Sequence, residues 1–128
     1  MKRIAILGST GSVGKSALSV VVSHSDRVQV VGLAAGQNAD LLARQVHQFK
    51  PTVVSLASPD AVERFRGSGD IGEVVTAYGE DGLEEVATHP DVDLVLCASS
   101  GTAALGATLA AIEAGKTIAL ANKEVLVM

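Results

Sequence analysis

The sequence predicts an α/β fold, doubly wound, in which a mainly parallel sheet of about six strands carries helices on both faces. Three observations predict it. Short Val-rich apolar runs alternate with longer segments of helical period along all 128 residues. The connections between apolar runs are too long for hairpins, so helical crossovers between parallel strands are expected. Hydrophobic residues make up 48% of the chain and aromatic residues 2%, so the core must be aliphatic, as in parallel sheets buried on both faces.

The first elements follow directly from this alternation. The apolar run at 3–8 (RIAILG) is the first predicted strand, and a helix is predicted from Ser12 to Ser23. The second strand spans 28–35 (VQVVGLAA), and a helix from Asn38 to Phe49 follows because its apolar residues recur at helical spacing. Lys50-Pro51 ends that helix, since the residue before a proline disfavours the α region.

The later elements repeat the pattern. The third strand spans 52–57 (TVVSLA), and Ser58-Pro59 opens a helix because proline is favoured in a first turn. A glycine-containing turn at 67–69 precedes a short strand at 73–77 and a helix from Glu80 to Thr88. The remaining predicted elements are a strand at 93–99, a helix at 102–114 ended by Gly115, and a strand at 116–121.

Composition and charge limit the partners and the compartment. The formal net charge of −4 argues against nucleic acid or an anionic membrane as a partner, although backbone N–H groups can still hold a small anion. The charged stretch at 63–66 and Glu80 are expected to be solvated surface charges. No signal-peptide core or membrane-spanning apolar stretch is visible, so a soluble cytoplasmic protein is expected. The single cysteine, Cys97, excludes an internal disulfide and a multi-cysteine zinc site, and is expected to be buried core filler.

Residues 8–16 (GSTGSVGKS) directly follow the first strand and resemble two different phosphate-binding loops. A P-loop requires a glycine five residues before the glycine of Gly-Lys-Ser. That position is Ser9, and the nearest glycine, Gly8, lies one residue too far away. No carboxylate that could hold Mg²⁺ follows the fifth strand either. The sequence therefore disfavours a nucleoside triphosphate site, and Lys15 becomes an ordinary residue of the following helix.

The same glycines fit a dinucleotide-binding turn, G-x-x-G-x-x-G, at Gly8, Gly11 and Gly14. Gly8 would permit the tight turn, and Gly11 would let a pyrophosphate approach the helix N-terminus. Gly14 would let the helix and the strand pack closely. The hydroxyl groups of Thr10 and Ser12 could donate hydrogen bonds to a phosphate. The position of this loop in an alternating chain favours a Rossmann-like cofactor domain.

The tip of the second strand indicates which dinucleotide is bound. An NAD enzyme usually carries Asp or Glu there to bind the 2′-hydroxyl of the ribose. The neutral residues 35–38 (AGQN) follow this strand instead, so no carboxylate repels a 2′-phosphate and NADP is favoured. No Arg or Lys occurs at the tip, so a modest preference is expected. Asn38 could also be the N-cap of the next helix.

A second polar stretch follows the sixth predicted strand. Asn122, Lys123 and Glu124 come at its carboxyl end, which is where ligands bind in open α/β sheets. Lys123 could hold a phosphate or carboxylate or polarise a substrate oxygen, and Asn122 could bond the nicotinamide side of the cofactor. A capped, solvated turn would explain the same residues.

Three stretches together resemble the 1-deoxy-D-xylulose 5-phosphate reductoisomerase family: ILGSTGSVGKSAL, AAGQN and AGKTIALANKEVLV. They extend over the whole chain in the expected order and spacing. The resemblance implies conversion of 1-deoxy-D-xylulose 5-phosphate to 2-C-methyl-D-erythritol 4-phosphate in non-mevalonate isoprenoid biosynthesis. It also implies NADPH and a divalent metal (Mg²⁺, Mn²⁺ or Co²⁺) as cofactors, a homodimer, and inhibition by fosmidomycin.

The resemblance further implies site residues. Lys123 is the implied substrate contact, and no catalytic residue or metal ligand is implied within the chain. Gln37 stands where relatives often have a basic residue, which weakens the expected selection of a 2′-phosphate. The implied NADPH contacts lie in the first loop, after the second strand and after the sixth: Thr10, Gly11, Ser12, Val13, Gly36, Gln37, Asn38, Asn122 and Glu124.

The metal ligands, lid and phosphate-binding residues implied by the resemblance would follow Met128. His24, His47 and His89 are expected at helix ends or on exposed faces, so they predict no metal cluster. The chain also stops inside the apolar run VLVM. Residues 1–128 are therefore expected to be an NADPH-binding domain cut from a longer enzyme and inactive alone.

Two other functions remain open from the sequence. Homoserine and aspartate-semialdehyde dehydrogenases have similar first loops, and the former also have an Asn-Lys element after a strand. The latter need a catalytic cysteine, for which Cys97 on a buried strand is a poor candidate. A stand-alone nucleotide-sensing module is the third interpretation. Asp-Ser-Glu soon after Met128 would favour the reductoisomerase.

Overall fold

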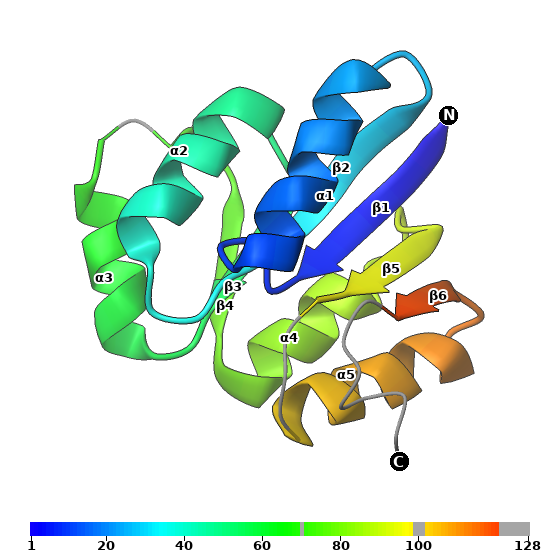
Figure 1. Cartoon of the computed structure of the whole chain (residues 1–128). Helices are drawn as coiled ribbons and strands as arrows, with labels where there is room; N and C mark the ends of the chain where they lie inside the picture. Colours follow the sequence, from blue (N-terminus) through cyan, green and yellow to red (C-terminus); the bar gives the residue numbers. More distant parts are fainter. Residues whose placement is uncertain (70, 99–101, 121–128) are drawn as a thin grey trace.

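Strands and helices alternate strictly along the part of the chain that the computed structural model describes, residues 1–69, 71–98 and 102–120 (Figure 1). The strands are β1 (Lys2–Leu7), β2 (Val28–Ala34), β3 (Val53–Leu56), β4 (Val75–Tyr78), β5 (Leu94–Cys97) and β6 (Thr117–Leu120). The helices are α1 (Ser12–Ser23), α2 (Ala39–Phe49), α3 (Pro59–Gly67), α4 (Gly79–Ala87) and α5 (Thr102–Glu113).

The strands form a single parallel sheet in the order β4-β3-β2-β1-β5-β6. From β1 the chain moves outward through β2 and β3 to the edge strand β4. It then returns beneath the sheet through α4 and continues on the other side of β1 with β5 and β6. This reversal makes the fold doubly wound and Rossmann-like, as predicted, and places the topological switch point between β1 and β5.

Two apolar layers cover the sheet, one on each face. Ile4 and Ile6 of β1 pack with α1, α2 and α3, whereas Ala5 and Leu7 pack with α4 and α5. Successive side chains of a strand point to opposite faces, so a strand buried on both sides must be apolar at every position. Figure 1 shows the same division, with α1 and α2 on one side of the strands and α4 and α5 on the other.

Helix α4 lies unusually close to the sheet because glycines replace side chains at the contact. A Cβ atom added to Gly32 of β2 would lie 2.8 Å from Cγ1 of Val86, and one added to Gly82 would lie 3.0 Å from Cβ of Ser55. The register between β1 and β2 also shifts here, since Ile4 pairs with Val30 and Ala5 with Gly32. Val31 is the extra residue of this irregularity, and it packs in the same apolar layer as Val86 of α4.

Most predicted boundaries agree with the structure to within two residues. The helix predicted from Ser12 to Ser23 has those limits, while Asn38 precedes α2 as its N-cap. The strands predicted at 73–77 and 93–99 are shorter or shifted in the structure, at Val75–Tyr78 and Leu94–Cys97. An apolar run marks burial, but a strand extends only as far as its neighbour offers hydrogen bonds.

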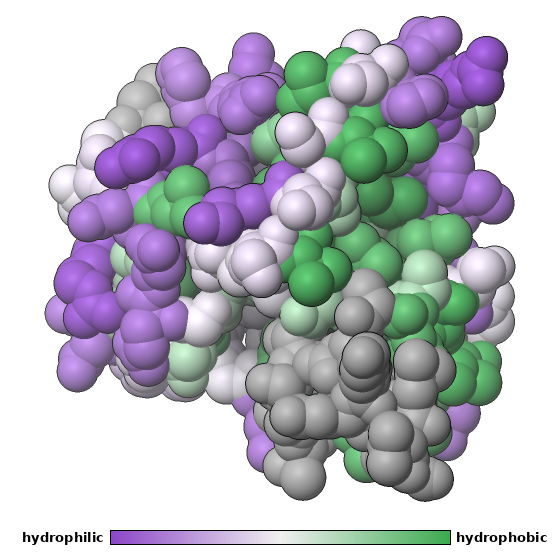
Figure 2. All heavy atoms as spheres, viewed as in Figure 1, coloured by the Kyte–Doolittle hydropathy of each residue, from purple (hydrophilic) through white to green (hydrophobic). Residues whose placement is uncertain are grey.

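The molecular surface is uneven in polarity. Figure 2 shows a mainly hydrophilic surface over α2 and α3 and apolar groups over α1, where Val13, Val20 and Val22 are exposed. Cys97 is fully buried, as predicted. None of the helices in the described ranges is long and apolar enough to cross a membrane.

Candidate functional site

The loop between β1 and α1 turns sharply at Gly8, whose φ of 92° is in the left-handed region that favours glycine. The backbone N–H groups of Gly8 and Ser9 both donate to the carbonyl oxygen of Ala34, at 2.8 and 2.9 Å. The loop is thereby attached to the last residue of β2. The tight turn predicted at Gly8 is present, and it brings the first loop against the tip of the second strand.

Gly14 allows α1 to lie directly against this loop. A Cβ atom at Gly14 would lie 2.1 Å from the carbonyl oxygen of Gly8 and 2.7 Å from Cα of Ser9. These are backbone atoms, which cannot move aside as a flexible side chain can. The third glycine of the motif therefore permits a close contact, as predicted, but its partner is the loop directly after β1 and not the strand itself.

The N-terminus of α1 is left open to solvent. Gly11 is the N-cap in extended conformation and makes no side-chain capping bond. The first N–H groups of a helix have no partner within the helix and carry its positive dipole end. Thr10 is half-buried, whereas Gly11, Ser12 and Val13 are exposed around these N–H groups. The four predicted cofactor contacts of the first loop thus lie at an uncapped helix end, a place where an anion can bind.

Gln45 of α2 supports the loop from below and was not identified from the sequence. Its side chain is buried, and Nε2 donates to the carbonyl oxygen of Ser9 at 2.9 Å. The signal was its position on the apolar face of the helix, beside Leu42 and Val46. A polar side chain at such a buried position needs a partner.

The tip of β2 continues alongside β3 beyond the end of the strand. Ala35 N–H donates to Ser55 O at 2.9 Å, and Ala57 N–H donates to Gly36 O at 3.0 Å. Asn38 then caps α2, since its Oδ1 accepts a hydrogen bond from Leu41 N at 3.2 Å. Gly36, Gln37 and Asn38 are all exposed. The predicted capping role of Asn38 is present, and its role toward a cofactor stays a prediction.

A basic residue does reach the tip of β2, contrary to the expectation drawn from the sequence. Nη2 of Arg64, on α3, donates to both the carbonyl oxygen and Oε1 of Gln37, each at 3.2 Å. The charged stretch 63–66 was interpreted as surface charge alone. Arg64 lies 27 residues after Gln37, and the parallel neighbours β2 and β3 bring the two together.

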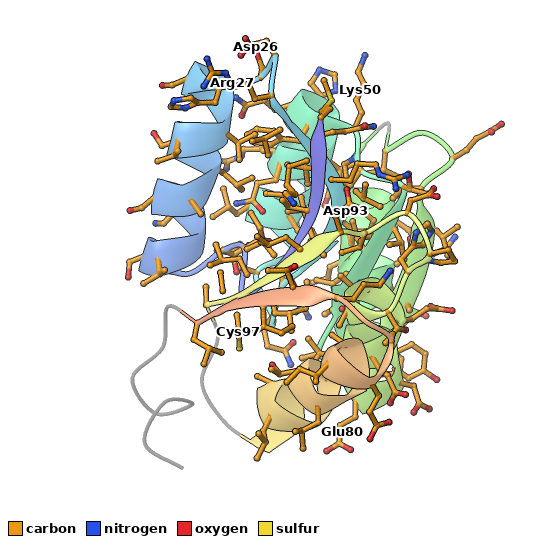
Figure 3. The ribbon with its side chains drawn as sticks, turned by 90° about the vertical axis from the view of Figure 1, so that its right-hand side faces the viewer. Asp26, Arg27, Lys50, Glu80, Asp93 and Cys97 are labelled. Carbon is orange, nitrogen blue, oxygen red and sulfur yellow. The ribbon has the colours of Figure 1, made fainter. Side chains whose placement is uncertain are left out.

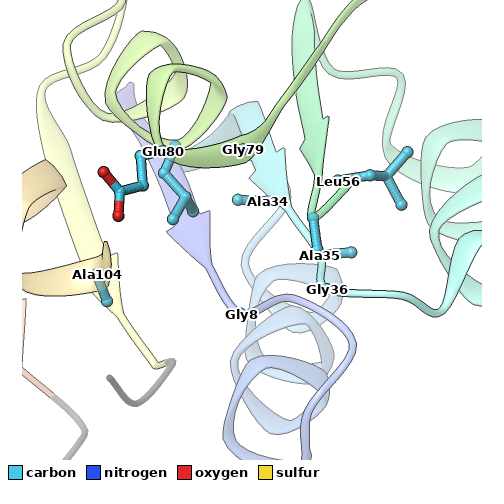
Figure 4. A pocket seen from close by; sticks show the side chains of 10 residues that line it. Gly8, Ala34, Ala35, Gly36, Leu56, Gly79, Glu80 and Ala104 are labelled. Carbon is cyan, nitrogen blue, oxygen red and sulfur yellow. The ribbon is translucent and has the colours of Figure 1, made fainter. Parts of the chain in front are cut away.

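A cavity of about 270 Å³ opens beside the first loop at the carboxyl ends of β1, β2 and β3 (Figure 4). Its wall includes Gly8, Ala35, Gly36 and Leu56, with Glu80 from the first turn of α4 on the opposite side. Glu80 was expected to be a solvated surface charge. It is exposed, but it is also one of the residues that line this mostly apolar cavity.

The third group of predicted site residues, Asn122, Lys123 and Glu124, lies outside the described residues. In the described ranges no group of three His, Cys, Asp or Glu side chains is placed to hold a metal ion. His24 and His89 instead bond their own segments, through Val20 O at 3.0 Å and Asp91 N at 3.1 Å.

Comparison with known proteins shows which family has this sequence and fold. A family model described as 1-deoxy-D-xylulose 5-phosphate reductoisomerase matches residues 4–128. The chain belongs to this family. The reductoisomerase of Anaeromyxobacter sp. (strain K) is 52% identical over 128 residues, covering 100% of this chain and 33% of the relative. That of Geobacillus sp. (strain WCH70) is 46% identical, covering 99% of this chain and 33% of the relative.

Solved structures of reductoisomerases have the same fold. The Zymomonas mobilis enzyme in complex with NADPH superimposes with a TM-score of 0.89 at 38% identity, over 98% of this chain and 33% of that one. A reductoisomerase in complex with NADPH, fosmidomycin and magnesium gives a TM-score of 0.89 at 36% identity, over 100% and 32% of the two chains. The chain spans about a third of the length of its reductoisomerase relatives. The dehydrogenase alternatives find no support in these matches.

Proposed function

We propose that this chain is the NADPH-binding part of a 1-deoxy-D-xylulose 5-phosphate reductoisomerase. The whole protein would isomerise 1-deoxy-D-xylulose 5-phosphate and reduce the product with NADPH to 2-C-methyl-D-erythritol 4-phosphate. The observation that carries the proposal is the glycine loop, Gly8 to Gly14, which presents an uncapped helix N-terminus beside the tip of β2. Relatives of the same fold have been solved with NADPH bound.

The pyrophosphate of the cofactor fits the end of α1. The backbone N–H groups of Ser12 and Val13 belong to the first turn of that helix, where the dipole favours an anion. A Cβ atom on Gly11 would have no neighbour closer than 3.7 Å, so the space above this residue is open. The hydroxyl groups of Thr10 and Ser12, the residues on either side of Gly11, are proposed as further hydrogen-bond donors.

The adenosine half fits the other side of the loop. The cavity beside Ala35 and Gly36 is mostly apolar, which suits the faces of an adenine ring. A Cβ atom added to Gly36 would have no neighbour within 4 Å, so the space beside this residue is open. Gly36, Gln37 and Asn38 are exposed at its edge for the ribose and 2′-phosphate. When bound, NADPH supplies the hydride, and these residues hold and orient it. The nicotinamide contacts are proposed at Asn122 and Glu124, with Lys123 touching the substrate.

A divalent metal does not fit the described residues, which contain no suitable group of three ligands. The metal ligands, like the homodimer contacts, are proposed to lie elsewhere in a cytoplasmic enzyme. Residues 1–128 are proposed to bind NADPH without converting the sugar phosphate.

Calorimetric titration of the full chain with NADPH and NADH tests this function. NADPH is expected to bind more tightly than NADH. Gly11→Val places a side chain in the open space above the loop and is expected to weaken NADPH binding at least about tenfold, equivalent to about 1.4 kcal/mol. Gly67→Val is the matched control, because Gly67 also has open space around it but lies at the end of α3.

Failure to bind either nucleotide would contradict the proposed function. Turnover of 1-deoxy-D-xylulose 5-phosphate by the 128-residue chain would contradict the proposal that these residues bind NADPH without converting the sugar phosphate. Equal loss of binding in the Gly11→Val and Gly67→Val variants would show that the loop does not hold the pyrophosphate.

A further inference from the structure

The tip of β2 must recognise a doubly charged phosphate without a charged residue of its own. Gly36, Gln37 and Asn38 are neutral and exposed. In NADP-binding domains of this topology an arginine nearby accommodates the 2′-phosphate of the adenosine ribose. A neutral tip removes repulsion but provides no attraction. A positive charge is therefore expected to come from another element.

Arg64 provides a positive charge at this position. Its Nη2 donates to the backbone oxygen and to Oε1 of Gln37, both at 3.2 Å. Ser58, the N-cap of α3, approaches the same Oε1 with its Oγ at 3.5 Å. Helical side chains tilt toward the helix N-terminus, so Arg64 reaches back from α3 toward the strand tips.

The guanidinium keeps donors free for a ligand. Both hydrogen bonds from Arg64 to Gln37 are donated by Nη2. Among the described residues, no group accepts a hydrogen bond from Nε or Nη1 of Arg64. Arg64 is exposed, so an incoming phosphate can approach it. A planar guanidinium matches phosphate geometry with two parallel N–H groups. The nearby acidic residue Asp40 instead accepts a hydrogen bond from Ser68 Oγ at 3.4 Å, toward the C-terminal end of α3.

We propose that Arg64 recognises the 2′-phosphate of NADPH and determines the preference for NADPH over NADH. This inference rests on the proposed function, because it assigns a specificity-determining residue to the same cofactor site. Gln37 holds the guanidinium at the strand tip through its backbone oxygen and its side chain. The charge that other relatives would place in the loop after β2 is supplied here from α3.

The test compares Kd values of the full chain for NADPH and NADH in Arg64→Ala, Arg64→Lys and Arg66→Ala. Arg66 is the matched control because it is exposed on the same helix and its removal changes the net charge equally. Arg64→Ala is expected to weaken NADPH binding about tenfold or more, as for loss of a charge-assisted hydrogen bond, and NADH binding less than about twofold. Arg64→Lys is expected to retain part of the preference.

Two further measurements separate phosphate recognition from support of the loop. Adenosine 2′,5′-diphosphate is expected to lose affinity in Arg64→Ala while adenosine 5′-monophosphate does not. Binding of NADPH to Arg64→Ala is also expected to depend less steeply on salt than binding to the original chain. Thermal melting of each variant is expected to be unchanged, since Arg64 is exposed.

Equal weakening of NADPH and NADH in Arg64→Ala would overturn the inference, because it would show that Arg64 only shapes the loop. An unchanged NADPH affinity would overturn it as well, and so would an equal effect of Arg66→Ala. In each of these cases the proposed function would stand, since NADPH would still bind. Absence of binding of both nucleotides to the original chain would overturn the proposed function and this inference together.

Discussion

Gln45 and Ser9, 36 residues apart in the sequence, are joined by a buried hydrogen bond in which Nε2 of Gln45 donates to the carbonyl oxygen of Ser9 at 2.9 Å. The bond connects α2, which follows the second strand, to the loop that follows the first. Ser9 is fully buried, so water does not replace a lost donor there. The shape of the loop after β1 therefore depends on a helix outside the glycine motif.

Replacing Gln45 tests this dependence. Gln45→Met keeps the side-chain length but removes the donor, and leaving the buried Ser9 oxygen unsatisfied is expected to lower the free energy of unfolding by about 1–3 kcal/mol. Urea denaturation measures the change. Gln48→Met, the same substitution on the exposed side of α2, is expected to change it by less than about 0.5 kcal/mol. Similar values for the two variants would contradict a supporting role for Gln45.

Gly14 and Gly106 make a matched pair for the effect of adding one methyl group to a helix. Gly14→Ala is expected to destabilise the fold by about 1–3 kcal/mol or more, because the added Cβ meets loop backbone. Gly106 is exposed in α5 with open space around it. Gly106→Ala is expected to stabilise the fold by about 1 kcal/mol through helix propensity. Thermal and urea unfolding measure the stability change of both variants. A Gly14→Ala variant as stable as the original chain would contradict the close contact between α1 and the loop backbone.

Arg3 and Asp93 join β1 to the start of β5 and predict a pH dependence. Side-chain and backbone hydrogen bonds from Arg3 lower the pKa of Asp93, with Arg3 N at 3.0 Å and Nε at 3.3 Å from Oδ2. Because the folded pKa is lower than the unfolded one, the stabilisation is complete above about pH 4 and is lost as the pH falls through the lowered value. Figure 3 shows Asp93 and Cys97 toward opposite ends of β5.

Asp93→Asn measures this contribution. The variant is expected to be less stable than the original chain at neutral pH, with a difference that shrinks as the pH falls below about 4. Asp26→Asn removes a carboxylate from the turn between α1 and β2, at an exposed position, and is the control. Urea unfolding at a series of pH values records both, and a difference that grows toward acid pH would have the wrong sign.

Cys97 is expected to be chemically inert in the folded chain. Its side chain is fully buried at the end of β5, 3.5 Å from Oγ1 of Thr108. Buried thiols react only when the structure opens. Ellman's reagent is expected to modify Cys97 rapidly in denaturant and only slowly without it, with glutathione as the reactivity standard. Rapid modification of the native protein would show that the end of β5 is accessible.

The fold and the first loop were predictable because their signals are local. A run such as IAIL at 4–7 is apolar at every position only when both faces of a strand are covered, which indicates a parallel sheet. Gly8 and Gly14 were predicted correctly because a turn and a close helix contact arise between residues a few positions apart. The predicted strand limits were less accurate, since a strand extends only as far as its neighbour offers hydrogen bonds. The apolar run of one strand does not reveal the length of its neighbour.

Arg64, Gln45 and Glu80 were missed as site residues for the opposite reason. Each contacts the site from an element distant in the sequence, and each resembles an ordinary polar helix residue when only its neighbours are considered. Arg64 was interpreted as surface charge because α3 carries charges at several exposed positions. Nothing in the stretch 63–66 indicates that one of them reaches Gln37.

The sequence by itself determined the alternating α/β order, the glycine turn that excludes a P-loop, and the resemblance to the reductoisomerase family. Those properties depend on side-chain period and on backbone conformations within short segments. Only the tertiary structure decided that α2 supports Ser9, that α3 delivers a guanidinium to Gln37, and that α4 lines the cavity beside the first loop. Parallel strands align their carboxyl ends, so residues from separate crossovers meet at one edge of the sheet.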